Sequence, residues 1–211
     1  MLDPVSDRSK PQLRIQLIRA RRLLAPAAHE AEALALAQHI PTLPNISGTV
    51  CAYVPIGTEP GSVALLEALQ ELAERVLLPV AVNTSDGVPL PLLWGEYRPG
   101  ELVAARFGLM EPAGPSLPAE TLSEAALVIV PALAVDHHGG RLGRGAGFYD
   151  RSLPLRDPAA HLVAVVRDEE LVAELPVAAH DVRMTHAVTP GGGVVTLEHR
   201  EWRGPDGGSS T

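Results

Sequence analysis

Short apolar runs alternate with segments of helical character along most of the chain, and this alternation predicts the order of the elements. We predict helices in five segments: 10–24, 27–40, 61–75, 146–153 and 168–174. We predict strands in eight: 49–55, 76–82, 90–94, 101–106, 126–131, 161–166, 186–189 and 193–198. Continuous apolar strands that alternate with helices are typical of a parallel sheet covered on both faces. The pattern therefore predicts an α/β fold, a three-layer α/β/α sandwich with a mostly parallel central sheet.

The first predicted helix is amphipathic, with a basic face opposite its apolar stripe. Pro11 suits its first turn, and Ser62 is a suitable N-cap for the helix at 61–75. The residues at helical spacing along the stripe are Leu13, Leu17, Ile18, Arg21 and Leu24.

The remaining segments set the limits of the fold. Residues 107–120 are rich in Pro and Gly and are predicted to form an ordered loop, and residues 203–211 are predicted to be a disordered tail. Neither an internal repeat nor an inter-domain linker interrupts the pattern. We therefore expect a single domain over residues 8–199.

The richest cluster of chemically informative residues lies at 136–151, directly after the apolar run 125–135. It holds five glycines, three arginines and two aspartates. Glycines let a backbone approach a ligand closely, arginines bind phosphate or carboxylate oxygens in pairs, and Asp150 offers a hard oxygen to Mg²⁺. The spacing fits neither a P-loop nor a dinucleotide fingerprint. We predict an anion-binding loop, with a solvated turn as the plainer interpretation.

The predicted topology places this loop beside a second one. Ligands of parallel sheets bind beyond the carboxyl ends of the strands. The loops at 55–60 and 136–148 follow two of the predicted strands. We therefore expect both loops to line the entrance of one binding site.

Composition narrows the class of protein. Hydrophobic residues make up 46% and charged residues 20%, as in globular proteins, and the net charge of −8 argues against a general nucleic-acid binder. The single cysteine, Cys51, excludes an internal disulfide and lies in an apolar run, so we predict a buried position. The chain shows neither a signal-peptide pattern nor an apolar run of membrane-spanning length. We expect a cytoplasmic protein that does not bind membranes.

Five segments, in order, resemble the 5-formyltetrahydrofolate cyclo-ligase family. The most specific is the loop Gly140–Arg151 (GRLGRGAGFYDR). The others are Lys10 with Leu13 and Arg14, the segment 53–59 (YVPIGTE), the segment 107–112 (FGLMEP), and His180-Asp181 with Met184. The resemblance covers roughly residues 8–199, nearly the whole chain.

The resemblance implies an activity and a fold. The family closes the ring of 5-formyltetrahydrofolate to give 5,10-methenyltetrahydrofolate, with ATP as co-substrate, Mg²⁺ as cofactor, and ADP and phosphate as products. ATP phosphorylates the formyl oxygen, and N10 of the folate then attacks the activated carbon. Such chemistry needs positive charge and positioning but no protein nucleophile. The implied fold is that of the cyclo-ligases and the related NagB, RpiA and CoA-transferase proteins; we expect a monomer.

The resemblance also assigns roles to residues. It implies catalytic roles for Lys10, Arg141 and Arg144, and a Mg²⁺ ligand at Asp150. The implied substrate contacts are Val54, Glu59, Arg144, Gly145, Ala146, Gly147 and Phe148. The implied ATP contacts are Lys10, Arg14, Arg141, Leu142, Gly143, Arg144, Gly145, Ala146, Gly147, Phe148 and Tyr149.

Plainer interpretations stay open for several of these residues. Lys10 and Arg14 could form a solvated basic face, Glu59 could be an exposed acid, and Asp150 could be a helix-surface acid paired with Arg151. Tyr149 could simply pack on its helix.

One departure from the family bears on the metal. Thr185 stands where the family usually has a second acid, thought to assist the metal, and a neutral hydroxyl is a weaker ligand. His137 and His138 lack the spacing of a zinc site.

The activity itself also has alternatives. The chain could be a family member that acts on another N-formyl or folate-related substrate. It could be a non-catalytic folate- or nucleotide-binding protein. A sugar-phosphate isomerase on a related fold is a further alternative.

Overall fold

The computed structural model describes residues 9–176, 178 and 181–198. The tail predicted at 203–211, and His180, lie outside this part of the chain. Within it, no helix is both long and apolar enough to cross a membrane.

A seven-stranded, mostly parallel sheet forms the centre of the molecule, with the strand order β12-β11-β9-β6-β1-β2-β3. The parallel strands are β1 (Thr49–Cys51), β2 (Arg75–Val80), β6 (Leu127–Pro131), β9 (His161–Val165) and β11 (His186–Thr189). The two edge strands run antiparallel to their neighbours: β3 (Leu93–Glu96) and β12 (Gly193–Thr196). The predicted α/β fold with a mostly parallel sheet is thus confirmed.

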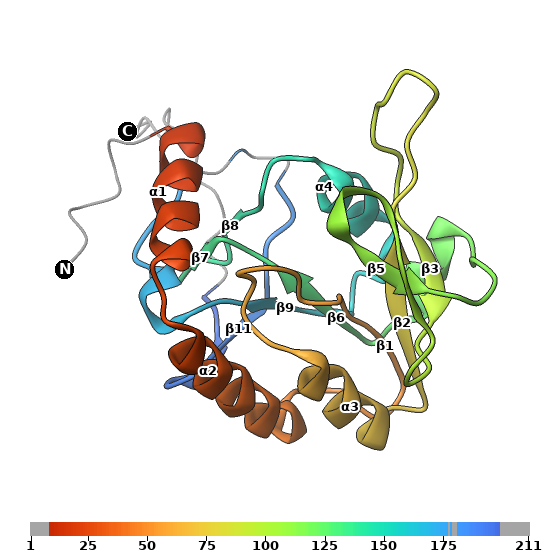
Figure 1. Cartoon of the computed structure of the whole chain (residues 1–211), viewed down its shortest axis with the longest axis horizontal. Coiled ribbons are helices and arrows are strands. Elements are labelled where there is room, and N and C mark those ends of the chain that lie inside the picture. Colours follow the sequence, from red (N-terminus) through yellow and green to blue (C-terminus); the bar gives the residue numbers. More distant parts are fainter. Residues whose placement is uncertain (1–8, 177, 179–180, 199–211) are drawn as a thin grey trace, which may run out of the picture.

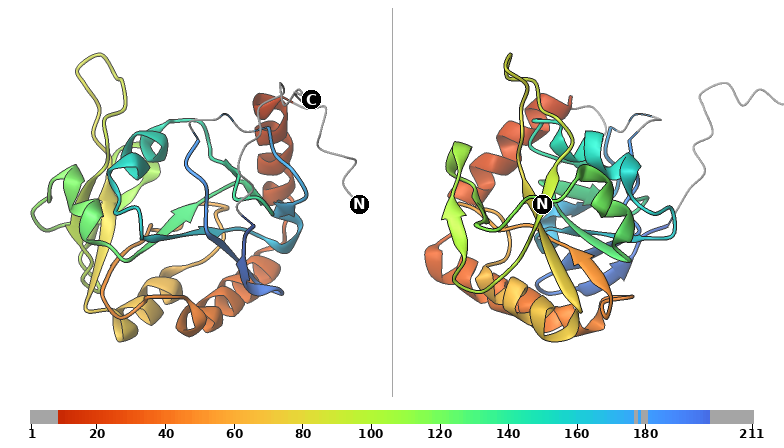
Figure 2. Two further views of the ribbon diagram at one scale, coloured as in Figure 1. Left: turned by 180° about the vertical axis from the view of Figure 1, so that it is seen from behind. Right: turned by 90° about the vertical axis from the view of Figure 1, so that its right-hand side faces the viewer.

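One face of this sheet is covered by α2 (Pro26–His39) and α3 (Val63–Leu72), as Figures 1 and 2 show. Side chains of a strand alternate between faces, so Val50 and Ala52 pack toward these helices while Cys51 packs on the other side. Cys51 is fully buried, as predicted. The Ser62 hydroxyl accepts a hydrogen bond from Ala64 N–H at the start of α3, which confirms the predicted N-cap.

The opposite face is covered by short elements rather than long helices. They are η4 (Ala119–Glu124), α4 (Phe148–Ser152) and η5 (Leu153–Leu155), where η denotes a 3₁₀ helix. Leu122 and Leu153 join Val128 and Val130 of β6 in the core on this side. The third layer of the predicted sandwich is therefore thin.

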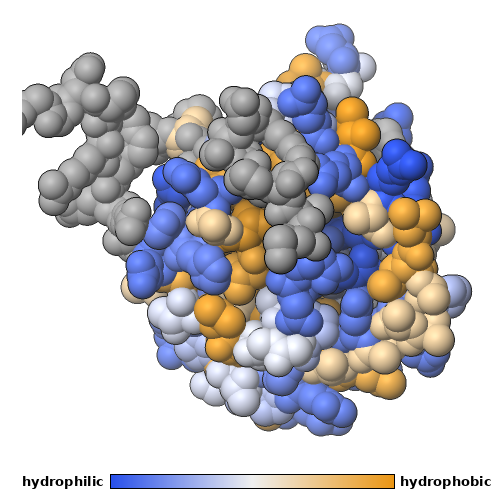
Figure 3. Space-filling view, turned by 90° about the vertical axis from the view of Figure 1, so that its left-hand side faces the viewer, coloured by the Kyte–Doolittle hydropathy of each residue, from blue (hydrophilic) through white to orange (hydrophobic). Residues whose placement is uncertain are grey.

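Helix α1 (Lys10–Arg22) belongs to neither layer. It packs through Leu13 and Leu17 against a small second sheet, with the strand order β10-β7-β8. These strands are β7 (Ala134–Asp136), β8 (Arg141–Leu142) and β10 (Leu171–Val172). Figure 3 views the molecule from the side of α1 and shows apolar side chains interspersed with hydrophilic ones.

The predicted helix at 168–174 was wrong, while the strand predicted at 126–131 is β6. The segment 168–174 forms a single 3₁₀ turn, η6 (Asp168–Glu170), followed by β10, because Leu171 and Val172 pair with β7. The apolar run 125–135 contains two strands in different sheets, β6 and β7. The β7–β8 hairpin therefore stands between the buried strand β6 and the glycine-rich loop, which does not follow that strand directly.

The predicted loop 107–120 contains more regular structure than expected. The loop contains β5 (Met110–Pro112), which pairs antiparallel with β4 (Leu102–Ala104), the strand predicted at 101–106. The two strands are joined by η3 (Arg106–Gly108). The remaining short element is η2 (Ile40–Thr42), which continues α2.

Candidate active site

A cavity of about 460 Å³ opens beyond the carboxyl ends of β1, β2 and β6. Its walls include Ile56 and Glu59 from one loop and the segment 143–150 from another. The prediction that the loops at 55–60 and 136–148 line the entrance of one binding site is thus confirmed. The volume suits a small organic ligand.

Most of the wall is apolar, with a few polar groups at defined places. The loop between β2 and β3, which stands out from the body in Figure 1, contributes Ala81, Asn83 and Pro89 from its base. Leu109 and Met110 line the wall beside it. The charged lining residues are Arg21, Glu59, Arg141, Arg144 and Asp150.

Glu59 is the buried acid of the cavity, with 8% of its surface exposed, so the interpretation as an exposed acid is wrong. Its Oε2 accepts a hydrogen bond from Ile56 N–H at 3.1 Å, and its Oε1 lies 3.1 Å from Arg144 Nε. Burial raises the pKa of the carboxyl above its ordinary value, although that hydrogen bond and two nearby arginines act to lower it. The protonation of the Glu59 carboxyl therefore depends on the hydrogen-bond donors and charges that lie beside it.

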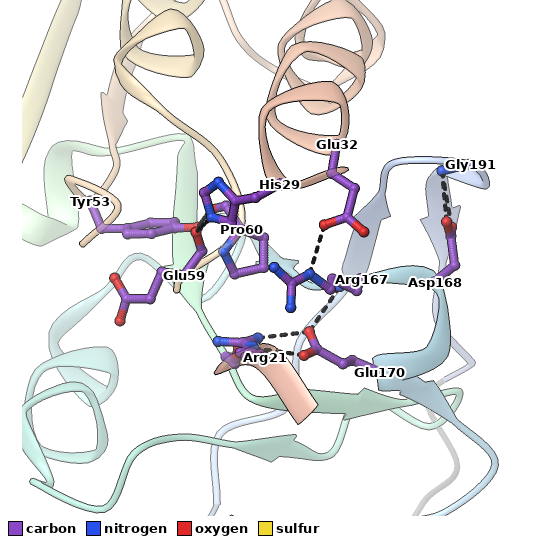
Figure 4. Close-up of polar contacts among 11 residues, drawn as sticks. Arg21, His29, Glu32, Tyr53, Glu59, Pro60, Arg167, Asp168, Glu170 and Gly191 are labelled. Carbon is purple, nitrogen blue, oxygen red and sulfur yellow. Dashed lines mark hydrogen bonds and ion pairs between the residues drawn. The ribbon is translucent and has the colours of Figure 1, made fainter. Parts of the chain in front are cut away.

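The backbone around Glu59 is held from two sides (Figure 4). The Tyr53 hydroxyl donates to the carbonyl oxygen of Pro60 at 2.7 Å, and His29 Nε2 lies 3.0 Å from the carbonyl oxygen of Glu59. These contacts come from α2 and from the segment after β1. They fix where the carboxylate enters the cavity.

Arg141 is the buried cation of the glycine-rich loop. Its Nη2 lies 2.8 Å from Asp150 Oδ1, its Nη1 donates to the carbonyl oxygen of Pro131, and its guanidinium lies 5.5 Å from the Tyr149 ring centre. Burial lowers its pKa, but an arginine stays charged at neutral pH. The Arg141 side chain is 8% exposed but lines the cavity, and its partner Asp150 is 66% exposed and can turn away toward a ligand.

The glycines of the loop serve two different purposes. Gly145 and Gly147 have φ of +97° and +84°, a region that side chains rarely adopt. Gly143 is not in that region; a Cβ there would lie 2.9 Å from Arg141 Nη1. Positive φ thus explains two of these three glycines, and Gly143 instead leaves room for the buried arginine.

Two basic residues of helix α1 contact other segments, and one of these segments is the glycine-rich loop. Arg14 Nε donates to the carbonyl oxygen of Gly143 at 2.9 Å, and Lys10 Nζ lies 2.8 Å from Asp181 Oδ2. Both residues are thus paired rather than fully solvated. Neither is among the described residues that line the cavity, and neither is Leu142, which packs against Leu13 and Leu17.

Helix α4 presents two aromatic rings and an acid to the cavity. Phe148 and Tyr149 also pack against the core beneath them. The buried Tyr149 hydroxyl has no hydrogen-bond partner among the described residues. Val54 and Ala146 complete the predicted ligand contacts that lie in the wall.

Two carboxylates line the described part of the cavity, and Asp150 is the one on the glycine-rich loop side, where a divalent metal ion would lie beside the phosphates. No three His, Cys, Asp or Glu side chains within the described ranges are grouped closely enough to hold a metal ion. The Thr185 hydroxyl is engaged elsewhere: it donates to the carbonyl oxygen of Leu162 and accepts from its N–H. A single carboxylate fits Mg²⁺ when phosphate oxygens and waters supply the other ligands.

Arg21 lines the cavity but was not predicted as a site residue. Arg21 is 2% exposed and lies in the wall together with Pro131 and Ala132. A signal for it did exist, because Arg21 interrupts the apolar stripe of its helix. A charged residue at such a position requires a buried partner.

Comparison with known proteins identifies the family. The profile of the 5-formyltetrahydrofolate cyclo-ligase family matches residues 6–190. The chain belongs to this family. The 5-formyltetrahydrofolate cyclo-ligase of Mycolicibacterium smegmatis is 58% identical over 193 residues, which cover 92% of this chain and 100% of that protein. The cyclo-ligase of Escherichia coli K12 is 33% identical, over 81% of this chain and 94% of its own length.

Solved structures agree with the cyclo-ligase assignment. The 5,10-methenyltetrahydrofolate synthetase of Aquifex aeolicus matches with a TM-score of 0.70 and 25% identity, over 92% of this chain and 94% of that one. The synthetase of Mycoplasma pneumoniae matches with a TM-score of 0.64 over 84% and 96% of the two chains; at 18% identity it supports the fold alone. The resemblance of the sequence motifs to the cyclo-ligases is thus confirmed.

Proposed function

We propose that this cyclo-ligase family member converts 5-formyltetrahydrofolate to 5,10-methenyltetrahydrofolate with ATP, releasing ADP and phosphate. The observation that carries the proposal is one cavity in which a buried carboxylate, Glu59, faces a glycine-rich loop with two arginines, Arg141 and Arg144. The Glu59 carboxylate suits the hydrogen-bond donors at the edge of a pterin, and the arginine-containing loop suits phosphate. Family membership and the 58% identical relative support the same reaction.

The pterin end is assigned to the Glu59 side of the cavity. A carboxylate accepts two hydrogen bonds, as the amino and N3–H groups of a pterin require. Val54, Phe148 and the apolar wall can cover the faces of the ring. The backbone of residues 144–147 lines the adjoining wall and is assigned to the reacting part of the substrate.

The phosphates are assigned to the glycine-rich loop and α1. The loop residues from Arg141 to Tyr149 supply backbone N–H groups and the two arginines, Arg14 holds the loop in place, and Lys10 adds positive charge from the first turn of α1. The two loop arginines stabilise the charge that spreads over the transferred phosphoryl group. Lys10 and Asp181 must separate if Lys10 is to contact a phosphate.

The reaction needs positioning rather than a protein nucleophile. The formyl oxygen attacks the γ-phosphorus, and the bond to ADP breaks. N10 then attacks the activated carbon, and the phosphate leaves with the former formyl oxygen as the N10 proton is lost. The cavity holds the two reacting groups in line and excludes water. Bound Mg²⁺, held by Asp150, would neutralise phosphate charge.

The deciding experiment is a spectrophotometric assay for methenyltetrahydrofolate with purified protein, 5-formyltetrahydrofolate, Mg²⁺ and ATP, with an ATP-free control. ATP-dependent product supports the proposal. Folded protein that binds folate by calorimetry without forming product would instead indicate a binding protein. Loss of both activity and binding would indicate another substrate.

A further inference from the structure

Arg21 is a buried cation in the cavity wall that the proposed mechanism leaves without a role. It comes from α1, is 2% exposed, and lines the cavity beside Ala132. Burial of a charged group costs free energy unless it is paired and its N–H groups find hydrogen-bond acceptors. The partner of each guanidinium nitrogen of Arg21 therefore matters.

Two of the three guanidinium nitrogens are used within the protein. Nε and Nη2 contact the two carboxylate oxygens of Glu170 at 2.6 and 2.7 Å, and Nη2 also donates to the carbonyl oxygen of Ala132 at 2.6 Å. Nη1 makes none of the contacts found within the described residues. In Figure 4 the guanidinium lies between Glu170 and Glu59, with one edge on Glu170.

The ion pair is held rigidly from behind. Glu170 Oε2 also accepts the backbone N–H of Arg167 at 2.9 Å, and Arg167 Nε donates to Glu32 of α2 at 2.7 Å. This network joins α1, α2 and η6 behind the cavity wall (Figure 4). Arg21 is therefore a donor whose orientation is set before any ligand binds.

The charge of Arg21 is already neutralised by Glu170. Both members of this pair are buried, whereas Arg141 and Arg144 each belong to a pair with an exposed member that can give way to a ligand. An arginine held in a fully buried pair is a poor anchor for phosphate but a good donor to a neutral acceptor, such as a carbonyl oxygen. The pterin edge that Glu59 would hold carries two donors, the 2-amino group and N3–H, and directly beside them one acceptor, the 4-oxo oxygen. Glu59 supplies the acceptor and Arg21 the donor that this edge requires.

We infer that Arg21 donates a hydrogen bond from Nη1 to the 4-oxo oxygen of the substrate's pteridine ring and so selects 4-oxo over 4-amino folates. The inference rests on the proposed function, since it takes the pterin to lie against Glu59. A 4-amino group would direct N–H bonds at the Arg21 donor and leave both unpaired, which is costly in a buried site.

The test compares 5-formyltetrahydrofolate with its 4-amino-4-deoxy analogue. The KM for the substrate, the inhibition constant of the analogue and the KM for ATP are measured for the wild type, Arg21→Lys and Arg21→Met/Glu170→Gln. Arg21→Lys keeps a charge for Glu170 but loses Nη1. The double variant removes the pair and keeps an acceptor for Arg167 N–H. We expect both to lose about tenfold or more of the wild-type preference for the 4-oxo compound, with the KM for ATP unchanged.

Arg75→Lys is the control, because Arg75 also pairs with a carboxylate, that of Glu124, but lies outside both this network and the described residues of the wall. Its preference should equal that of the wild type. An unchanged preference for the 4-oxo compound in either active Arg21 variant overturns the inference. The inference is also overturned if the wild type itself does not favour the 4-oxo compound, and that measurement requires no variant. Wild-type protein without ATP-dependent product would instead contradict the proposed function itself.

Discussion

Arg144 Nε lies 3.1 Å from Glu59 Oε1, so the residue assigned to phosphate and the residue assigned to the pterin are paired with each other. The other oxygen of Glu59 accepts from Ile56 N–H. A pterin edge that needs both oxygens must therefore displace Arg144. The Arg144 side chain is 46% exposed, so it can move away at little cost and become available to the phosphates.

Arg144→Ala tests the phosphate role. If Arg144 stabilises the transferred phosphoryl group, loss of its charge should lower kcat by about 10²–10³-fold. The KM for the folate substrate should change far less, because Glu59 remains in place. Steady-state kinetics of Arg144→Ala beside Arg98→Ala, an exposed arginine outside the cavity wall, provide the measurement. A folded variant with wild-type kcat would exclude this role.

Glu59→Gln tests pterin recognition. An amide has one acceptor where the carboxylate has two, and it carries no charge, so the KM for the folate should rise by about tenfold or more. The KM for ATP should stay near the wild-type value. Glu96→Gln, at an exposed position, is the control. Equal increases in the two KM values would argue against a pterin contact.

The same substitution has a consequence for stability. Because burial holds the pKa of Glu59 above its unfolded value, ionising the carboxyl costs folding free energy. The wild type should match Glu59→Gln most closely below the unfolded pKa of about 4.3, and should lose stability relative to it as pH rises through the folded pKa. Denaturant titrations of both proteins between about pH 4 and 8 measure this difference. A constant difference would mean that the pKa is not raised.

Much of the fold could be predicted because its strands are buried on both faces. Runs such as 161–166 are apolar at nearly every position, and only a covered parallel sheet suits them. The same signal predicted β6 within 125–135 but did not show β7, because two strands of different sheets can form one uninterrupted apolar run. It failed at Leu171 and Val172, where pairing with β7 outweighs local helical preference.

The candidate site was predictable to the extent that its residues are contiguous. The segment 143–150 and Glu59 do line one cavity. The identity of distant partners left no local signal: Lys10 pairs with Asp181 and Arg21 with Glu170, residues far apart in the chain. The plainer interpretation paired Asp150 with Arg151 on the helix surface, but the structure pairs Asp150 with Arg141.

Asp150→Asn tests the metal assignment. The neutral amide binds Mg²⁺ more weakly than a carboxylate, so the Mg²⁺ concentration for half-maximal activity should rise by about tenfold. Folding should be largely preserved, because the Asp150 side chain is 66% exposed. Mg²⁺ titrations at fixed ATP, with Asp157→Asn as an exposed control, make the comparison. An unchanged Mg²⁺ requirement would remove Asp150 from the metal site.

Thr185→Asp separates a metal position from a structural one. The Thr185 hydroxyl both donates to the carbonyl oxygen of Leu162 and accepts from its N–H, at 2.9 and 2.8 Å. A carboxylate could accept but not donate, and it would face the Leu162 carbonyl with like charge. We expect a loss of about 1–3 kcal/mol of stability and no gain in Mg²⁺ affinity.

The control is Thr185→Ser, which keeps the hydroxyl and should keep both the Tm and the Mg²⁺ titration close to wild type. Thermal unfolding and Mg²⁺-dependent activity of Thr185→Asp and Thr185→Ser distinguish a metal-binding role of Thr185 from a structural one. A carboxylate that lowered the Mg²⁺ requirement without lowering the Tm would show that Thr185 faces the metal. A lowered Tm with an unchanged titration would show that the hydroxyl serves the sheet, leaving Asp150 and the phosphates to hold the ion.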